Sequence, residues 1–347
     1  MLAFDSRAAR VAWTVALTGL LLGAVYAIRH TLLMFVFAIL LAYLLAPVVM
    51  IVDRFSSSRF PRALSLGIVY VVLLGAAAAV FSVAGSRVAA EASQLASFIP
   101  AYIREPQRLE QLPLPWWLRT YQQELMNFVI EQIQARQDRI VPMLTSAGKG
   151  LVSAVGSAVI LVIVPILSFF FLKDAPEIRD EIVAQFPPAR QPMVRDLLAD
   201  VHLLMGRFVR AIVLLALATF TIFSIALGLF DVRFAALLSA LAAVGEFIPV
   251  AGPAATGAAI LLVAMLSGSG NVLALLVFLI VYRLFLDYVL QPYLMGHGVE
   301  LPPLAIVFAI LAGEELGGIL GMFLSIPVLA ILRIVYVHYR KHQSVAV

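Results

Sequence analysis

The chain has 347 residues, of which 63% are hydrophobic and 13% charged, and its mean hydropathy is +1.03. Soluble domains carry about a quarter charged residues, so this composition excludes a soluble globular protein and predicts an all-α polytopic membrane protein. The net charge of +4 indicates basic cytoplasmic flanks rather than a nucleic-acid partner. The absence of cysteine excludes disulfides, thiolate catalysis and cysteine-ligated metals.

Residues 1–83 form the predicted N-terminal transmembrane region. Three apolar runs in it, at residues 11–28, 31–52 and 63–83, each have about the length needed to cross a bilayer. Arginines precede the first run and crowd the loop between the second and third. Since cytoplasmic loops carry an excess of Lys and Arg, we expect the N-terminus in the cytoplasm.

Charge returns in residues 84–150, where prolines divide apolar residues of helical spacing into short segments. This region follows an odd number of spans, so it is predicted to be a helical extracytoplasmic domain. Its adjacent Trp116 and Trp117 either anchor it at the membrane interface or pack inside it. Residues 151–172 are a fourth span, and residues 173–210 are predicted amphipathic helices on the cytoplasmic surface.

Residues 211–337 are the predicted transport core. They contain two full spans, each followed by an apolar stretch that glycine and proline interrupt, at residues 234–266 and 302–327. A span plus a broken hairpin, occurring twice, is the pattern that an inverted repeat produces. The chain then has about eight hydrophobic segments, two of them broken or re-entrant hairpins. The basic tail at residues 338–347 returns the C-terminus to the cytoplasm.

The first interruption reads GEFIPVAGPAATGAA and begins at residue 245. Pro249 and Pro253 cannot donate backbone hydrogen bonds, and Gly252 lies between them. Such a break is tolerated in lipid only where the freed backbone groups are buried in protein or line a wet cavity. Glu246 lies at the break, which points to a transport site. The alternative is a plain loop with Glu246 among the lipid headgroups, but the flanks are short for two complete spans.

Further ionisable residues occur within apolar segments. Arg283 and Asp287 are four residues apart on one span, so they share a helix face, either as a neutralised structural pair or as part of a pathway. Glu314 and Glu315 flank the second interruption. The candidate pathway residues are Glu246, Pro249, Gly252, Pro253, Arg283, Asp287, Gln291, Glu314 and Glu315.

Enzyme motifs are absent from the sequence. It contains no GxxxxGK[ST] phosphate loop, no HExxH and no GxSxG, and its five histidines are scattered without metal-site spacing. We therefore predict no enzymatic activity, no cofactor and no resident metal. Sodium ions or protons are expected only as transported species.

Five segments are similar, in order and spacing, to one bacterial family. They read AYLLAPVVMIVDRF from residue 42, RFPRALSLGIVYVV from residue 59, VIVPILSFFFLKD from residue 162, FIPVAGPAATG from residue 247, and DYVLQPYLMGHGVELPPLAIVFAILAGEELGGILGMFLSIPVLAIL from residue 287. The chain resembles the AI-2E transporter family, a group of bacterial permeases that includes the autoinducer-2 exporters.

This resemblance implies a protein of the bacterial inner membrane with about eight hydrophobic segments, assembled as a homo-oligomer such as a pentamer. It also implies export of a small solute such as autoinducer-2, or the sodium/proton exchange attributed to other members. Glu314 stands where the family often has Gly, Gly317 where Phe is frequent, and Asp287 where Glu is frequent. The second hairpin tip is therefore more acidic than the family pattern.

The prediction that combines these observations is a secondary transporter. It would export a small polar organic solute, similar to autoinducer-2, coupled to protons or sodium. One alternative is a monovalent cation/proton antiporter, and a second is a non-transporting membrane scaffold that recruits a partner through residues 84–150. The expected partners are the solute or ion, the lipid bilayer and further copies of the chain.

Overall fold

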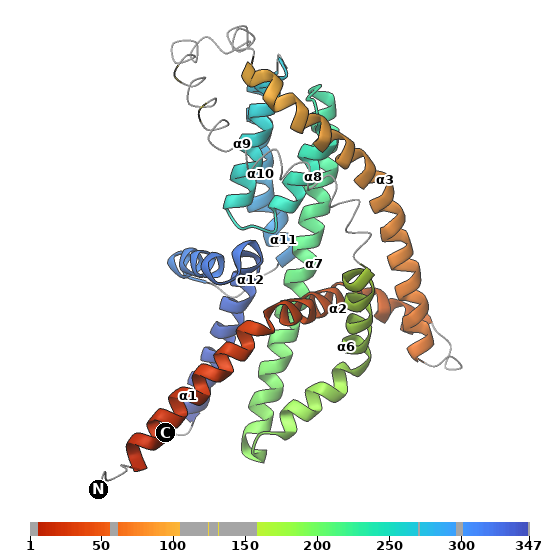
Figure 1. Cartoon of the computed structure of the whole chain (residues 1–347). Helices are drawn as coiled ribbons and strands as arrows, with labels where there is room; N and C mark the ends of the chain where they lie inside the picture. The colour runs from red at the N-terminus through yellow and green to blue at the C-terminus, as the bar shows by residue number, and fades with distance from the viewer. Residues whose placement is uncertain are drawn as a thin grey trace. The chain divides into compact units, whose positions relative to one another are not determined.

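The regular elements of the structure are all helices in the residues that it describes (Figure 1). The computed structural model describes residues 6–55, 62–104, 124, 131, 158–269, 271–295 and 301–345. The chain forms two compact units, the first made of Met1–Tyr70 with Ser157–Pro176, and the second of Val71–Gly156 with Glu177–Val347. An all-helical chain is the expected solution in lipid, because a helix satisfies its own backbone hydrogen bonds.

The first unit contains α1 (Ser6–Ala27), α2 (Arg29–Phe55), the start of α3 (Arg62–Arg104) and the start of α6 (Ala158–Ala184). A buried hydrogen bond of 2.7 Å joins the hydroxyls of Tyr70 on α3 and Ser168 on α6. The Tyr70 ring also packs edge-on against Phe169, with 5.9 Å between ring centroids. A paired hydroxyl satisfies each polar group in an otherwise apolar interface.

The second unit contains the rest of α3 and α6 and all the later helices. These are the short 3-10 turn η2 (Pro188–Arg190), α7 (Gln191–Leu229), α8 (Ala235–Gly245), α9 (Ala251–Leu266), α10 (Val272–Phe285), the π-helical segment η3 (Leu286–Leu290), α11 (Gln291–Met295) and α12 (Pro303–Val345). Their apolar core joins α7, α8, α9 and α10 to residues 88–95 of α3. The site described below lies within this unit.

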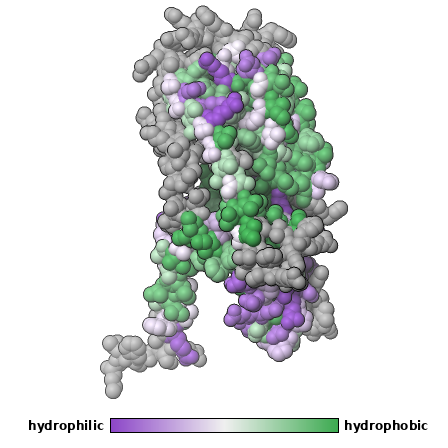
Figure 2. Space-filling view, turned by 90° about the vertical axis from the view of Figure 1, so that its right-hand side faces the viewer, coloured by the Kyte–Doolittle hydropathy of each residue, from purple (hydrophilic) through white to green (hydrophobic). Residues whose placement is uncertain are grey.

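Four helical stretches in the described residues are long and apolar enough to cross a membrane: Thr31–Ile51, Pro188–Leu229, Val272–Leu294 and Pro303–Arg340. Shorter apolar helices are Trp13–Ala27, Ala235–Gly245 and Ala251–Leu266. Hydrophobic side chains cover wide stretches of the visible surface in Figure 2, including many exposed Leu, Ile, Val and Phe. A surface of this kind is stable when lipid covers it.

Three predicted segment boundaries fall within continuous helices, and one of them, at residues 172 and 173, lies inside α6. α3 continues without interruption through residue 84, where we expected an extracytoplasmic domain to begin, and ends at Arg104. α7 likewise runs unbroken across residues 210 and 211, where a cytoplasmic segment was expected to give way to a span. Gly85 adjoins the boundary in α3, but a single glycine costs only about 1 kcal/mol within a helix, and no proline lies at any of the three boundaries, so the change in polarity does not end the helix. Most of residues 105–157, with Trp116 and Trp117, lie outside the described residues.

Candidate functional site

The predicted first interruption is present between α8 and α9. Helix α8 ends at Gly245, Glu246 is its C-cap residue, and α9 begins at Ala251. Val250 has φ 63° and ψ −55°, and a β-branched residue rarely adopts a positive φ. A Cβ atom placed on Gly252 would overlap the backbone carbonyl of Gly245, so the chain returns past itself closely enough to require glycine. The two helices therefore form a tight hairpin, which favours the first of the two readings of this stretch.

The second interruption lies inside α12. Gly318 has φ 59° and ψ −141°, so the helix is broken at that residue (Figure 1). A Cβ atom on Gly321 would overlap the carbonyl of Gly313, eight residues earlier. Residues so spaced lie about 12 Å apart along a straight helix, so the contact requires the chain to turn back. Pro327, by contrast, lies within the continuing helix.

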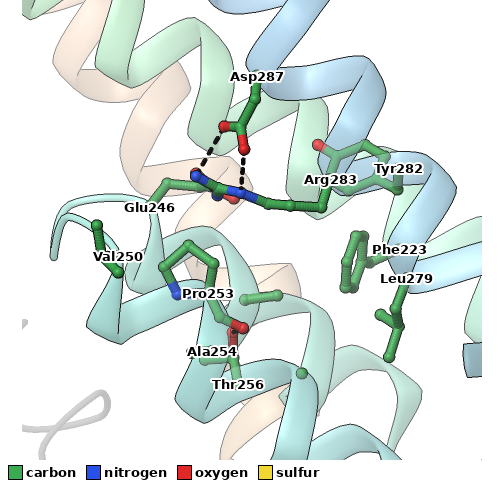
Figure 3. A pocket seen from close by; sticks show the side chains of 12 residues that line it. Phe223, Glu246, Val250, Pro253, Ala254, Thr256, Leu279, Tyr282, Arg283 and Asp287 are labelled. Carbon is green, nitrogen blue, oxygen red and sulfur yellow. Dashed lines mark hydrogen bonds and ion pairs between the residues drawn. The ribbon is translucent and has the colours of Figure 1, made fainter.

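Glu246 meets a charged pair from the neighbouring span. Arg283, near the end of α10, binds Asp287 through two contacts, Nε to Oδ2 at 2.8 Å and Nη2 to Oδ1 at 2.7 Å (Figure 3). Its third nitrogen, Nη1, lies 3.8 Å from Oε2 of Glu246, whose side chain is only 8% exposed. One guanidinium thus serves two carboxylates, and the cluster carries a formal charge of −1 (one arginine and two carboxylates). The predicted Arg283–Asp287 pair is present, and Glu246 joins it to form a cluster of three charged residues.

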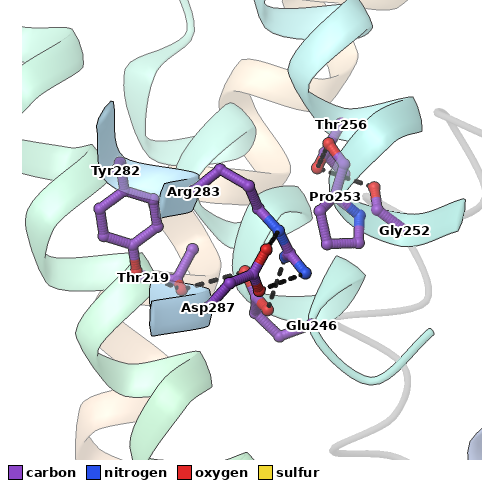
Figure 4. Close-up of polar contacts among 8 residues, drawn as sticks. All are labelled: Thr219, Glu246, Gly252, Pro253, Thr256, Tyr282, Arg283 and Asp287. Carbon is purple, nitrogen blue, oxygen red and sulfur yellow. Dashed lines mark hydrogen bonds and ion pairs between the residues drawn. The ribbon is translucent and has the colours of Figure 1, made fainter. Parts of the chain in front are cut away.

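Two hydroxyls extend this cluster (Figure 4). Thr219 on α7 donates from Oγ1 to Oε1 of Glu246 at 3.3 Å, and it lies 2.7 Å from the hydroxyl of Tyr282. A threonine hydroxyl has a single proton, so Tyr282 is the donor in the second bond. The hydroxyls of Tyr282 and Thr219 therefore form a chain of hydrogen bonds that ends at Glu246.

Sequence reasoning missed Thr219 and Tyr282. Thr219 is completely buried, whereas Thr221, two residues later, is exposed and bonds back to its own helix at Leu217. The two threonines lie in the same apolar stretch, so no local signal separates them. A polar residue next to Arg283 was the available hint for Tyr282.

The π-helical segment η3 contains Asp287. The backbone N–H of Gln291 bonds to the carbonyl of Leu286, five residues back, as in a π-helix. Pro292 follows and has no N–H to donate, which favours a local departure from α-helical register. Insertions of this kind are frequent at functional sites.

A cavity of about 370 Å³ opens beside the charged cluster. Its wall combines apolar surface with the charged and hydroxyl groups, and comes from α7, α8, α9, α10 and η3. The lining residues are Phe223, Ala242, Glu246, Val250, Pro253, Ala254, Thr256, Gly257, Leu279, Tyr282, Arg283 and Asp287. Within the described part of the chain, no group of three or more His, Asp or Glu side chains could hold a metal ion.

The structure brings together some of the predicted pathway residues and not others. Glu246, Pro253, Arg283 and Asp287 line the cavity, whereas Pro249 lies in the adjoining break and Gly252 at the backbone crossing. Three other predicted residues, Gln291, Glu314 and Glu315, do not contribute to this wall. Both glutamates are exposed beside the break at Gly318.

The chain matches the sequence model of the family described as "AI-2E family transporter" over residues 15–341. It belongs to the AI-2E transporter family. The predicted resemblance is therefore confirmed, and the AI-2E assignment makes the protein a multi-pass membrane transporter.

Relatives of this AI-2E protein carry names of the same kind. The chain is 23% identical over 309 residues to "Putative transport protein YrrI" of Bacillus subtilis strain 168, which covers 89% of this chain and 86% of the relative. It is 29% identical over 301 residues to "Putative transport protein MT0215" of Mycobacterium tuberculosis, covering 84% and 78% respectively. The names of these relatives are consistent with the prediction, made from the absence of enzyme motifs, that the chain has no enzymatic activity.

Proposed function

We propose that the protein is a secondary transporter that exports a small polar organic solute, similar to autoinducer-2, and that export is coupled to protons or sodium. The observation that carries this proposal is the cavity at the break between α8 and α9, with Glu246, Arg283 and Asp287 in its wall. Broken helices with ionisable residues are where secondary transporters bind their substrates and coupling ions. Because the sequence has no nucleotide-binding phosphate loop, an ion gradient is the energy source we favour.

The size and lining of the cavity support an organic solute. At about 370 Å³ it lies within the range of small-molecule pockets and is much larger than one water or a bare sodium ion. Phe223 and Tyr282 offer ring surface, and Thr256 a hydroxyl. The buried Nη1 of Arg283 finds no hydrogen-bond acceptor among the described residues. A solute oxygen would satisfy it, and an unsatisfied buried donor is otherwise costly.

The charge balance supports cation coupling. Two carboxylates share Arg283, so one negative charge remains for a proton or sodium ion to neutralise. Neutralising Glu246 would weaken its attraction for Nη1 of Arg283 and change the wall that the solute contacts. Ion binding and solute binding would then be linked through one side chain, as coupled transport requires.

On the family resemblance and the distribution of basic residues, we further propose the bacterial inner membrane as the location, with both termini in the cytoplasm. A homo-oligomer such as a pentamer is proposed on the resemblance alone. Cross-linking of the protein in native membranes would give the subunit number.

Flux in proteoliposomes tests the proposed function. Purified protein is reconstituted, proton or sodium gradients are imposed, and internal pH and uptake of a panel of small polar solutes are recorded. Proton movement that requires an organic solute supports the proposal and identifies the solute class. The matched control is the Glu246→Gln variant, which should reconstitute equally and lack gradient-dependent flux. Folded protein that moves no solute on the panel under either gradient would count against the proposal.

A monovalent cation/proton antiporter is the second candidate, because the cluster has the net negative charge that such a site needs. It predicts proton movement upon addition of sodium or potassium without any organic solute. It also predicts salt tolerance in an antiporter-deficient host, which Asp287→Asn should abolish.

A further inference from the structure

The N-terminus of α8 lacks a cap of its own. Its N-cap residue, Phe234, has φ 61° and ψ 37° and makes no side-chain hydrogen bond to the helix. The first turn of a helix leaves backbone N–H groups without partners, and in an apolar environment each one is costly. One of them, the N–H of Leu237 at the third helical position, donates to Oε2 of Glu91 at 2.9 Å. A carboxylate from α3 therefore caps α8.

Glu91 is well placed for this contact. Its side chain is 16% exposed, and its other oxygen lies 3.6 Å from Nε of Arg87, one turn earlier on α3. A negative charge at a helix N-terminus also interacts favourably with the helix dipole. The Arg87 side chain is 76% exposed and contacts the other carboxylate oxygen, so it does not compete with the hydrogen bond from Leu237.

Aromatic contacts also join α3, through Phe98, to the start of α8. Phe98 packs edge-on against Phe234 with ring centroids 5.6 Å apart, and the guanidinium of Arg233 lies 5.6 Å from the centre of the Phe98 ring. Val88 and Leu95 of α3 belong to the same buried cluster as α8 side chains. The start of α8 is thus attached to α3 by a hydrogen bond, by ring contacts and by apolar packing.

The opposite end of α8 carries the charged cluster. The helix has eleven residues, and the N–H of Glu246 still bonds to the carbonyl of Ala242 at 3.2 Å. Leu237 and Glu246 are therefore about 14 Å apart along one short helix. Because the eleven residues form one continuous hydrogen-bonded helix, we expect a shift at Leu237 to be passed on to Glu246.

We propose that Glu91 is a positioning residue for transport: by capping α8 it holds the first hairpin where Glu246 meets Arg283. Glu91 does not line the cavity and acts through α8. The proposal rests on the proposed function for the part that Glu246 plays in transport, and on geometry alone for the placement of α8.

Three substitutions test this role. Glu91→Leu keeps approximate size and removes the acceptor, whereas Glu91→Gln keeps an acceptor oxygen and removes the charge. The matched control is Arg87→Gln, which removes the exposed ion pair and leaves the cap intact. The chain has no native cysteine, so a single cysteine at Ala242, a buried position of α8 in the cavity wall, reports placement of the helix through its rate of thiol alkylation. Flux is measured in protein without this cysteine.

In Glu91→Leu we expect alkylation of the position-242 cysteine to be about fivefold faster, the effect of losing a typical N-cap. The KM for the coupling ion should rise by a similar factor while the maximal rate stays within about twofold. Glu91→Gln should restore both values most of the way to wild type, and Arg87→Gln should leave both unchanged.

The outcomes separate the two proposals. Unchanged alkylation in Glu91→Leu overturns the positioning role, as does a lower maximal rate with unchanged KM, the mark of a merely structural contribution. If wild-type protein moves no solute or ion, the proposed function fails, and the alkylation rates still decide whether Glu91 places α8. Faster alkylation together with a raised KM supports both.

Discussion

The two interrupted helices of the second unit turn by the same device but differ in what surrounds the turn. In each, two glycines approach so closely that a Cβ atom would overlap backbone: Gly245 with Gly252, and Gly313 with Gly321. At the first turn, Glu246 is buried against an arginine and a threonine. At the second, the acidic residues next to Gly318 are exposed.

The difference teaches that a broken helix does not make a polar site by itself. The first hairpin has Arg283 of α10 opposite its break, and the attraction of this guanidinium offsets part of the desolvation cost of burying the Glu246 carboxylate. Near Gly321 the contacts are aromatic. The ring of Phe323 packs against Phe247 and Phe208, with centroid distances of 5.5 Å and 5.9 Å. The two turns therefore contact each other through rings, and only one of them carries charge into the interior.

The largest effect is expected at the glycine crossings. Gly252→Ala and Gly321→Ala each place a methyl group into backbone, so the free energy of unfolding should fall by about 3 kcal/mol or more. Thermal unfolding in detergent measures this loss. Gly228→Ala and Gly317→Ala are the matched controls, because a Cβ atom there meets nothing within 4 Å. Equal stability of the crossing variants and the controls would show that the turns are looser than described.

The next largest effect compares the two acidic positions. Glu246→Gln should abolish gradient-driven flux, because the amide cannot carry the charge that a proton or sodium ion is proposed to neutralise. Glu315→Gln, at the exposed second turn, should leave flux within about twofold. The measurement is initial flux in proteoliposomes at matched protein content. A greater loss for Glu315→Gln would place the coupling carboxylate at the second turn.

Arg283→Lys tests whether geometry matters beyond charge. Lysine keeps the positive charge but cannot serve Asp287 through two parallel bonds and reach Glu246 as well. We expect roughly tenfold lower flux, measured as the ratio of maximal rate to KM. Full activity in this variant would mean that the site needs a positive charge and no particular shape.

The smallest effect is expected from the hydroxyl chain. Thr219→Val keeps the shape and removes the donor to Glu246, at a cost of about 1 kcal/mol, or roughly fivefold in flux. Thr221→Val is the control on the same helix, because its hydroxyl bonds only to Leu217 and is exposed. Indistinguishable fluxes for the two variants would remove Thr219 from the site.

Local chemistry made part of the site predictable. Proline and glycine act on the residues beside them, so the break near Pro249 could be located from the sequence. The Arg283–Asp287 pair followed from a spacing of four on one helix. A segment boundary placed where the polarity changes was less predictable, because a helix can continue through such a change. α3, for example, continues past residue 84.

Contacts between distant segments were not predictable in this way. Thr219, Tyr282 and Glu246 come from three helices, and no periodicity brings them into register. The cap that Glu91 gives to α8 joins residues 146 positions apart in the chain. The same holds for Glu314 and Glu315, whose charge resembled that of Glu246 until their exposure was known.

The sequence by itself determined that this chain is a helical membrane protein of the AI-2E family, where its apolar helices break, and which charges lie within them. These properties depend on composition and on neighbours within a few residues, which act in any tertiary context. Only the tertiary structure decided which break encloses a cavity, which carboxylate is buried, and which hydroxyls reach it. The reason is physical: burial and pairing of a polar group depend on the helix opposite, and that helix is set by packing of the whole unit.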